Sequence, residues 1–391
     1  MSNENNENIV IIGGGIIGVC SAYYLSERYK GKITLIEQND IASCASGKAG
    51  GFLAKDWYTS QLQSLGDLSF KLHDDLNKLY NGERNWQYRK LKSSNVLVKA
   101  LKGLDDRKPK PNVALENLED IEEFRPRPPA SSDGVSDINW IFKPSKSEDK
   151  NARGVILHEL VSDEDTTAQV DPYKFTKFIF NECVKNGVEY IKSSPKSIEN
   201  ETIHLDNYTQ VKFSKLLLCA GPWTSSLFET LFPFCDYQLP IDNLPGYSLI
   251  IKPKSVPSPH AIFTTILGAG DSMSGSPELF SRPDNTIFVA GENTGPILPK
   301  SSNEVDKIAD LNCDNWDRLF KSVNELGIDS TNSEIVKKQL CYRPITNKRK
   351  PLISSLDTLG LKNVFVCSGH GPWVSLLNLL QLVSDCIYFY I

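Results

Sequence analysis

A glycine-rich turn near the N-terminus constrains the fold of this chain more than any other feature. The run NIVII at residues 8–12 is apolar throughout, as in a strand buried on both faces, and it leads directly into the triplet GGG at 13–15. Over residues 16–29 the apolar side chains recur at intervals of three and four, which predicts a helix. A second apolar run, ITLI at 33–36, completes a strand–helix–strand unit.

The triplet begins a dinucleotide-binding fingerprint, Gly13-x-Gly15-x-x-Gly18. Gly13 permits a tight turn, Gly15 lets a pyrophosphate approach the backbone, and Gly18 lets the helix pack against the strand. Glu37 follows 19 residues after Gly18, at the end of the second strand. A carboxylate there accepts hydrogen bonds from ribose hydroxyls and repels a 2′-phosphate, which disfavours NADP.

The fingerprint alone leaves both NAD and FAD open. The first turn of the helix, at Ile16 and Ile17, offers free N–H groups and a positive dipole end to the diphosphate of either cofactor. The segment ASCASGKAGG at 42–51 supplies many backbone N–H groups and little bulk, which suits a loop folded over a pyrophosphate and a flavin edge. Taken by itself, this segment also fits a flexible loop without a ligand.

Two further runs of apolar residues end in glycine far along the chain. Residues 216–219 precede Ala220-Gly221-Pro222-Trp223, and residues 364–367 precede Ser368-Gly369-His370-Gly371. Between them, the region 239–289 predicts several short strands, with turns at 245–246 and 283–285. This pattern predicts a nucleotide-binding domain that is built from several chain segments and interrupted by a second domain.

Helices are predicted at two more places. An amphipathic pattern covers residues 62–79, with Leu65, Leu68, Leu72, Leu76 and Leu79 on one face. A second helical pattern runs from Asp171-Pro172 through 184, followed by a strand at 188–191. Residues 103–151 are rich in proline and charge and predict a loop-dominated insertion.

Composition narrows the class of protein. At 391 residues the chain is too long for one compact core, which predicts two domains. Its 48 acidic and 43 basic residues give a formal charge of -5, which argues against non-specific nucleic-acid binding. The polar first eight residues lack the order of a signal peptide and predict a cytoplasmic protein. Nine scattered cysteines without a Cys-x-x-Cys pair predict reduced thiols and no metal site.

The chain ends in an apolar run, residues 373–391. Asn378, Gln381 and Asp385 interrupt its apolar surface, which favours a buried terminal helix. A tail anchor of marginal spanning length is the alternative; because the run lacks basic flanks, we expect no stable membrane insertion.

The motifs together resemble the FAD-dependent oxidoreductases of the D-amino acid oxidase family, which includes glycine, sarcosine and D-amino acid oxidases. The resemblance spans most of the chain, apart from the insertion and the C-terminal end. It rests, in chain order, on GGGIIG at 13–18, ASGKAGG at 45–51, VDP at 170–172, LLLCAGPW at 216–223, LPGYSL at 244–249, CYRPITNKRKPLI at 341–353 and VFVCSGHGPW at 364–373. The stretch GFLAKDW at 51–57 resembles most closely the fungal oxidoreductases of this family.

The resemblance implies an α/β fold with two interleaved domains. One is a Rossmann-type FAD-binding domain (GR2-like), expected to comprise residues 1–90, 166–236 and 344–391. The other is a substrate domain with a mixed or antiparallel β-sheet, expected to comprise residues 91–165 and 237–343.

The resemblance also implies which residues hold FAD. The ADP half is expected to contact Gly13, Gly15, Ile16, Ile17, Gly18, Glu37 and Gln38. The diphosphate, ribityl chain and flavin are expected to be wrapped by Ser46, Gly47, Lys48, Ala49, Gly50 and Gly51. The residues that would lie against the cofactor after a buried strand are Ala220, Gly221 and Trp223. The pyrimidine end of the flavin is expected to meet Gly369, Gly371, Pro372 and Trp373.

Four side chains are candidates for the chemistry. The resemblance implies that Arg343 holds a substrate carboxylate through two parallel bonds; the alternative is a surface arginine or a structural salt bridge. His370 is expected to donate a hydrogen bond to the reduced flavin, unless its ring merely packs. Cys341 stands where sarcosine-oxidising relatives attach flavin covalently, although a small buried thiol is the favoured interpretation. Lys48 could stabilise charge or assist oxygen activation, or face solvent.

The implied activity is oxidation of a C–N bond in a small amino acid or secondary amine, with oxygen as the electron acceptor. The implied partner is therefore a small molecule rather than nucleic acid. Two alternatives stay open: a flavin-binding protein of regulation or membrane traffic with little or no turnover, and an NAD-linked dehydrogenase.

Overall fold

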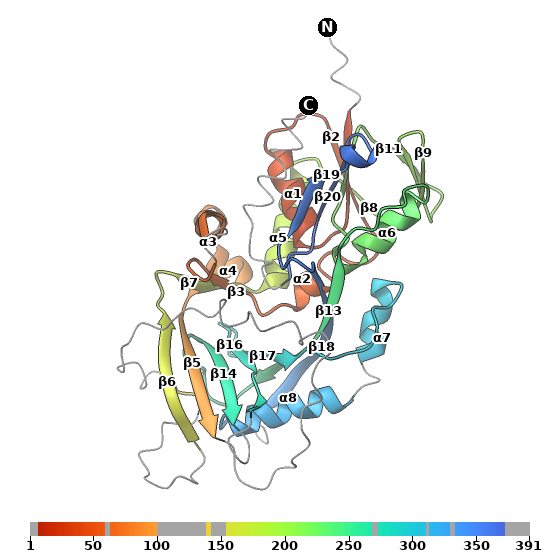
Figure 1. Cartoon of the computed structure of the whole chain (residues 1–391). Helices are drawn as coiled ribbons and strands as arrows, with labels where there is room; N and C mark the ends of the chain where they lie inside the picture. The colour runs from red at the N-terminus through yellow and green to blue at the C-terminus, as the bar shows by residue number, and fades with distance from the viewer. Residues whose placement is uncertain are drawn as a thin grey trace.

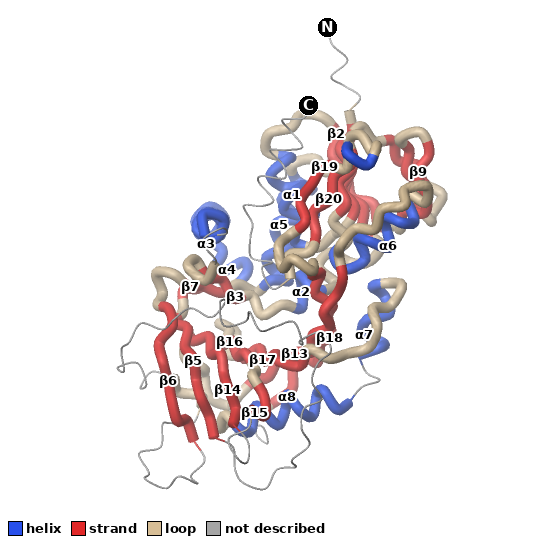
Figure 2. The backbone as a smooth tube through the Cα atoms, viewed as in Figure 1, coloured by secondary structure: helices blue, strands red, loops and turns tan. Residues whose placement is uncertain are grey.

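The computed structural model describes residues 7–58, 63–99, 138–141, 154–267, 273–309, 313–328 and 333–371. Two sheets dominate the molecule (Figures 1 and 2). The first, the parallel sheet, takes its strands from three separate stretches of the chain. Its order is β19 (Leu352–Ser355), β20 (Val364–Ser368), β12 (Lys215–Leu218), β1 (Asn8–Ile12), β2 (Lys32–Glu37) and β8 (Glu189–Lys192), with only β19 antiparallel to its neighbour.

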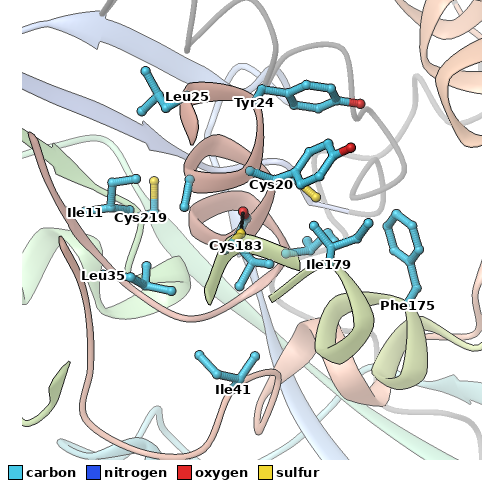
Figure 3. Close-up of a cluster of buried hydrophobic side chains, with 14 of the residues drawn as sticks. Ile11, Cys20, Tyr24, Leu25, Leu35, Ile41, Phe175, Ile179, Cys183 and Cys219 are labelled. Atoms are coloured by element: carbon cyan, nitrogen blue, oxygen red, sulfur yellow. Dashed lines mark hydrogen bonds between the residues drawn. The ribbon is translucent and has the colours of Figure 1, made fainter. Parts of the chain in front are cut away.

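Both faces of the parallel sheet are covered, because its strands are apolar on both sides. On one face lie α1 (Ile16–Ser26) and α5 (Pro172–Lys185), whose side chains pack with Ile11 and Leu35 in a buried cluster (Figure 3). On the other face lie α6 (Thr224–Leu231) and a small sheet of β9 (Pro195–Glu199), β10 (Thr202–Leu205) and β11 (Gln210–Lys212).

The second sheet, the mixed sheet, is antiparallel except where β14 and β5 pair in parallel. Its order is β18 (Glu334–Ile345), β13 (Asp242–Lys252), β17 (Ile287–Glu292), β16 (Glu278–Ser281), β14 (His260–Leu267), β5 (Lys92–Lys99) and β6 (Gly154–Ser162), with β15 (Met273–Gly275) also paired to β14. One face is covered by α8 (Cys313–Glu325), which packs on Tyr247 and Leu340 in a second core. The α/β class with a Rossmann-type part and a mixed sheet is therefore confirmed.

Smaller elements connect the two sheets. The strands β3 (Phe52–Ala54), β7 (Thr167–Gln169) and β4 (Arg89–Lys90) form a third sheet beside α3 (Gln63–Tyr80) and α4 (Gly82–Trp86). The short helix α2 (Ala45–Lys48) follows β2. After β17 come a 3-10 turn η5 (Ser302–Glu304) and α7 (Val305–Ala309), which Figure 1 shows beside β18.

Two expectations from the sequence differ from the structure. The turn expected at 245–246 is wrong, because Pro245 and Gly246 lie inside β13 and pair with Tyr342 and Cys341. Pro245 has no N–H to donate, but β17 pairs with β13 only from Tyr247 onward, so that side of the strand needs no donor there.

The second difference concerns α3. The helix is present, but its buried face is Gly66, Ser69, Phe70, His73 and Leu76, while Leu68 and Leu79 are exposed. The ring of His73 packs against Phe175 of α5 at 5.1 Å between centroids. The aromatic partners on α5 and α4 therefore set the rotation of this helix, and the leucine spacing alone does not show them.

The expected insertion at 103–151 lies outside the described residues, apart from 138–141. The apolar run at 373–391 also lies outside them. Among the helices that the structure describes, none combines the length and apolar character needed to cross a bilayer.

Candidate functional site

A cavity of about 620 Å³ opens where the strands β20, β12, β1 and β2 end. Carboxyl ends of parallel strands meet at one edge of a sheet, and ligands bind at that edge in folds of this kind. The cavity lining brings together residues that are far apart in the chain. From the expected set it includes Gly13, Gly15, Ile16, Ile17, Glu37, Gln38, Ser46, Ala220, Gly221, Trp223 and His370.

Two glycines of the fingerprint are required by close backbone contacts. Gly13 has φ +119°, and a Cβ atom there would lie 2.3 Å from the carbonyl oxygen of Cys219. A Cβ atom on Gly18 would lie 1.9 Å from the carbonyl oxygen of Gly13. Any side chain at Gly18 would therefore push α1 away from the turn that precedes it.

The start of α1 is open to a ligand. The residue just before the helix, Gly15, has no side chain to cap it. The hydroxyl of Ser46 accepts a hydrogen bond from the N–H of Ile16 at 2.9 Å. A Cβ atom on Gly15 would meet only the Ser46 side chain within 4 Å, and one on Gly221 would meet nothing. Backbone N–H groups and the positive helix end thus face unfilled space, as an anion site requires.

Glu37 is half-buried at the end of β2. Its carboxylate accepts hydrogen bonds from the N–H of Gly14 at 2.6 Å and from the N–H of Asn39 at 2.8 Å. Burial raises the pKa of this carboxyl group, and the backbone N–H donors offset part of that rise. The side chain is therefore held rigidly at the rim of the cavity.

The loop at 42–51 divides between the cavity and the protein interior. Ser46 lines the cavity, whereas Gly47, Lys48, Ala49, Gly50 and Gly51 are absent from its described lining. A Cβ atom on Gly50 would lie 2.4 Å from the ring of Phe280 in the mixed sheet, so the loop touches that sheet directly.

Lys48 does not face solvent. Its side chain is 7% exposed, and its Nζ binds Asp306 of α7 at 2.5 Å and the carbonyl oxygen of Leu340 at 3.1 Å. The solvent-facing interpretation of Lys48 is therefore wrong, because a buried ammonium needs such partners. This lysine joins the loop after β2 to the mixed sheet.

His370 is buried in the loop after β20. Its Nε2 lies 3.9 Å from the sulfur of Cys367, while its Nδ1 is buried without a hydrogen-bond partner among the described residues. The flanking glycines, Gly369 with φ +77° and Gly371 with φ +56°, permit the turn that carries the ring. A buried ring nitrogen without a partner at a cavity wall is a candidate to bind a ligand.

A pair of thiols borders the same ring. Cys219 follows β12 and Cys367 lies on the neighbouring strand β20, and both line the cavity. Burial raises the pKa of the Cys219 thiol, whereas hydrogen bonding from Cys219, with a contribution from His370, lowers the pKa of Cys367. Pro372 and Trp373, expected beside this loop, lie outside the described residues.

Arg343 lies on the face of the mixed sheet that α8 does not cover. Side chains alternate along a strand, so Leu340 and Tyr342 point into the core under α8 while Cys341 and Arg343 point to the opposite face. Arg343 donates a hydrogen bond to the Oδ1 of Asn293 at 2.6 Å, and no carboxylate among the described residues pairs with it. The alternative of a structural salt bridge therefore has no partner within the described part of the chain.

The Arg343 side chain lies outside the described cavity lining but is tied to its edge. The next residue, Pro344, lines the cavity, and its carbonyl oxygen accepts a hydrogen bond from the N–H of Gly371 at 2.6 Å. Arg343 and His370 are thus joined through one backbone contact. Cys341 is buried opposite Gly246 on the same strand pair and is not in the described lining.

Several lining residues were not expected from the sequence. Among them are Ser193 and Ser194 after β8, and Lys300 and Ser302 before α7. No motif marks these positions, because they reach the cavity only through the tertiary fold.

Comparisons with known proteins agree with this geometry. A family model described as FAD dependent oxidoreductase matches residues 8–378. “Putative oxidoreductase TDA3” of Saccharomyces cerevisiae is 27% identical over 95% of this chain and 89% of its own length, which confirms the fungal resemblance. Two solved structures share the fold at 15% identity. One is L-proline dehydrogenase from P. horikoshii, with a TM-score of 0.68 and a match that covers 99% of this chain and 94% of that one. The other is glycine oxidase from Geobacillus kaustophilus, with a TM-score of 0.66 and a match that covers 98% of this chain and 95% of that one.

Proposed function

Because this chain belongs to the family of FAD dependent oxidoreductases, and its cofactor is therefore FAD, we propose that it oxidises the C–N bond of a small amino acid or secondary amine. The family membership makes the NAD-linked alternative wrong. Three features of the described residues support this substrate class: the fit of the cavity to FAD, the apolar face of the mixed sheet and the charge of Arg343.

The residues at the cavity fit FAD. The uncapped start of α1 and the open space above Gly15 and Gly221 suit a diphosphate that approaches the backbone. The buried Nδ1 of His370, without a partner among the described residues, suits a ring edge that offers or accepts a hydrogen bond. Glu37, held by two backbone N–H groups, keeps acceptor capacity for ribose hydroxyls.

The face of the mixed sheet opposite α8 suits one wall of a substrate site. It carries Ile250, Phe263, Phe280 and Phe288, and the loop residue Gly50 packs directly on Phe280. The loop that the family resemblance assigns to the flavin is therefore in contact with an apolar and aromatic wall. Sites for small molecules are commonly lined this way, with a few charged groups that fix orientation.

Arg343 supplies the charged group for that orientation. A guanidinium fork binds a carboxylate through two parallel hydrogen bonds, and Arg343 has only the neutral amide of Asn293 as a described partner. The amide aligns the guanidinium without neutralising it. This unpaired charge on the face opposite α8 is the observation that carries the proposal of an amino-acid substrate.

When bound, FAD supplies an acceptor for the two electrons released from the carbon that bears nitrogen. Arg343 would hold the carboxylate, so that the amine-bearing carbon has one fixed orientation. His370 and the backbone N–H groups of 369–370 would meet negative charge that develops in the cavity. The apolar wall would exclude water from the reacting carbon.

The test is steady-state peroxide release from purified, FAD-loaded protein over a panel of amino acids, N-methyl amino acids and amines that lack a carboxylate. We expect turnover on carboxylate-bearing amines and none on the matched amines without a carboxylate. A yellow protein with no turnover on any amine would contradict the proposal and favour a flavin-binding regulatory protein.

A further inference from the structure

The stretch between β17 and α8 brings residues of the mixed-sheet part of the molecule to the FAD cavity. We call residues 299–306 the crossing segment. Within it, Lys300 and Ser302 line the cavity, although the other lining residues belong to the parallel sheet, to the helices, loops and small sheet that adjoin it, or to β18. The FAD site therefore has a wall that the fingerprint does not encode.

Three contacts fix the crossing segment to the parallel-sheet part. The indole Nε1 of Trp223 donates a hydrogen bond to the carbonyl oxygen of Pro299 at 2.7 Å. The Nε2 of Gln38 donates one to the hydroxyl of Ser302 at 2.7 Å, and the buried Lys48 pairs with Asp306. Trp223 follows β12, Gln38 follows β2, and Lys48 lies within the loop at 42–51.

The strand order shows what lies between the first two contacts. Trp223 follows β12 and Gln38 follows β2, and β1 is the strand between β12 and β2. Two strand spacings measure about 10 Å, which three extended residues can just span. The segment from Pro299 to Ser302 is thus held by side chains from both sides of β1, and it lines the same cavity as the glycine turn and the start of α1.

Lys300 sits in the middle of this crossing. It is the only lysine or arginine in the cavity lining formed by described residues, and it pairs with no described carboxylate. The other charged lining residues are the acids Glu37, Asp40 and Glu229. The diphosphate of FAD carries negative charge that the glycine turn meets only with N–H groups and the helix dipole.

We propose that Lys300 is a cofactor-binding residue that pairs with the FAD diphosphate from the side opposite the glycine turn, and that the Gln38–Ser302 hydrogen bond holds the crossing segment in place over the bound cofactor. Lys300 is then presented on a fixed backbone. Ser301 and Glu304 form a capping box at η5, and Val305 and Ala309 are buried in the core under α8.

Gln38 takes a different role in this proposal from the one the family resemblance implies. Both ends of its amide are engaged by protein groups: Nε2 donates to Ser302, and Oε1 accepts from the hydroxyl of Ser194 at 3.1 Å. The side chain is therefore a positioning residue for the crossing segment.

The first experiment measures the rate of FAD release on dilution, from the recovery of free-flavin fluorescence, and needs no substrate. Lys300→Ala is expected to release FAD roughly fivefold faster, as for loss of one partly solvated ion pair, and Lys300→Arg to stay near wild type. Raised salt should accelerate release from the wild type more than from Lys300→Ala. Lys307→Ala is the matched control, because Lys307 is an exposed lysine of α7 outside the lining.

The second experiment separates the hydrogen bond from the charge. Ser302→Ala removes the contact of Gln38 with the crossing segment, whereas Ser194→Ala removes only the other end of the Gln38 amide. We expect release to be about three- to tenfold faster for Ser302→Ala. We expect a smaller change for Ser194→Ala.

Equal release rates for Lys300→Ala, Lys307→Ala and wild type at low salt would overturn the role of Lys300. Faster release from Ser194→Ala than from Ser302→Ala would overturn the role of the Gln38–Ser302 bond. Because neither measurement involves an amine substrate, a failure here is distinct from a failure of the proposed activity.

Discussion

At the scale of single residues, Arg343 and Glu37 show how burial and partners decide what a charged group can do. Arg343 keeps its charge available because its described partner is an amide, not a carboxylate. Glu37 is half-buried and held by backbone N–H groups, and its partial removal from water raises the pKa of its carboxyl group. Each leads to a test.

Arg343→Met keeps a long side chain but removes the charge. Charge-assisted hydrogen bonds contribute about 1.5–3 kcal/mol each, so kcat/KM for an amino acid should fall roughly 10- to 150-fold or more. FAD content should not change, because Arg343 is absent from the described lining. Arg318→Met is the matched control, since Arg318 pairs with Glu292 at the surface. Equal losses for both variants would argue against a carboxylate-binding role.

Glu37 predicts a pH dependence of the cofactor-free protein. Because burial raises the pKa of Glu37 in the folded state, its contribution to stability is present at low pH and is lost as pH rises through the folded pKa. The window begins at the ordinary glutamate pKa and extends above it. In urea unfolding across that window, wild type should lose stability relative to Glu37→Gln. A difference that is independent of pH would contradict this.

At the residue scale, motif spacing identified the glycines and Glu37 as candidates, and the family resemblance added Arg343. The structure brings all of them to one edge of the parallel sheet or its neighbourhood. The sequence could not show that Lys48 is buried against Asp306, a residue of a distant segment. The FAD-binding role that the resemblance implies for each residue stays a prediction. The favoured interpretation of Cys341, a small buried thiol without a bond to flavin, also stays a prediction.

At the scale of elements, the turn between β1 and α1 depends on backbone contacts too close for any side chain. Gly18→Ala would place a Cβ atom 1.9 Å from the carbonyl oxygen of Gly13. We expect a loss of about 1–3 kcal/mol in the free energy of unfolding, and weaker FAD binding because the start of α1 moves. Gly275→Ala is the control, since its nearest atoms lie 3.7 Å or more away.

The chemical denaturation midpoint and the FAD content of the two glycine variants are the measurements. If Gly18→Ala retained FAD as the control does, close packing of α1 on the turn would not matter for binding. At this scale the continuous apolar runs of the sequence predicted the strands β1, β2, β12 and β20 correctly. It misplaced a turn inside β13, because the absence of a β17 partner at Pro245 is a property of the sheet and not of the local sequence.

At the scale of the whole molecule, the cavity belongs to both sheets. Its lining combines the glycine turn of the parallel sheet with Pro344 of β18 and with Lys300 and Ser302 of the crossing segment. A ligand that fills it contacts both parts and stabilises them together. The residue boundaries of the two expected domains stay a prediction.

Saturation with FAD should therefore raise the unfolding free energy of both parts at once. At free FAD about 100-fold above its dissociation constant, the gain is about 2.7 kcal/mol. The expected result is one unfolding transition that shifts upward with FAD, seen both by far-UV circular dichroism and by tryptophan fluorescence, to which Trp316 in the core under α8 contributes. Two transitions, of which only one moves with FAD, would show that the mixed-sheet part does not share in binding.

The sequence by itself determined the strand–turn–helix unit, the acidic residue after the second strand and the family, because these depend on local spacing and on backbone conformations that only glycine adopts easily. Only the tertiary structure decided the partners of Lys48, the position of Arg343 on the face opposite α8, and the contacts that bring the crossing segment to the cavity. Those features arise where segments far apart in the chain meet, and the packing that joins them leaves no periodic signal in the sequence.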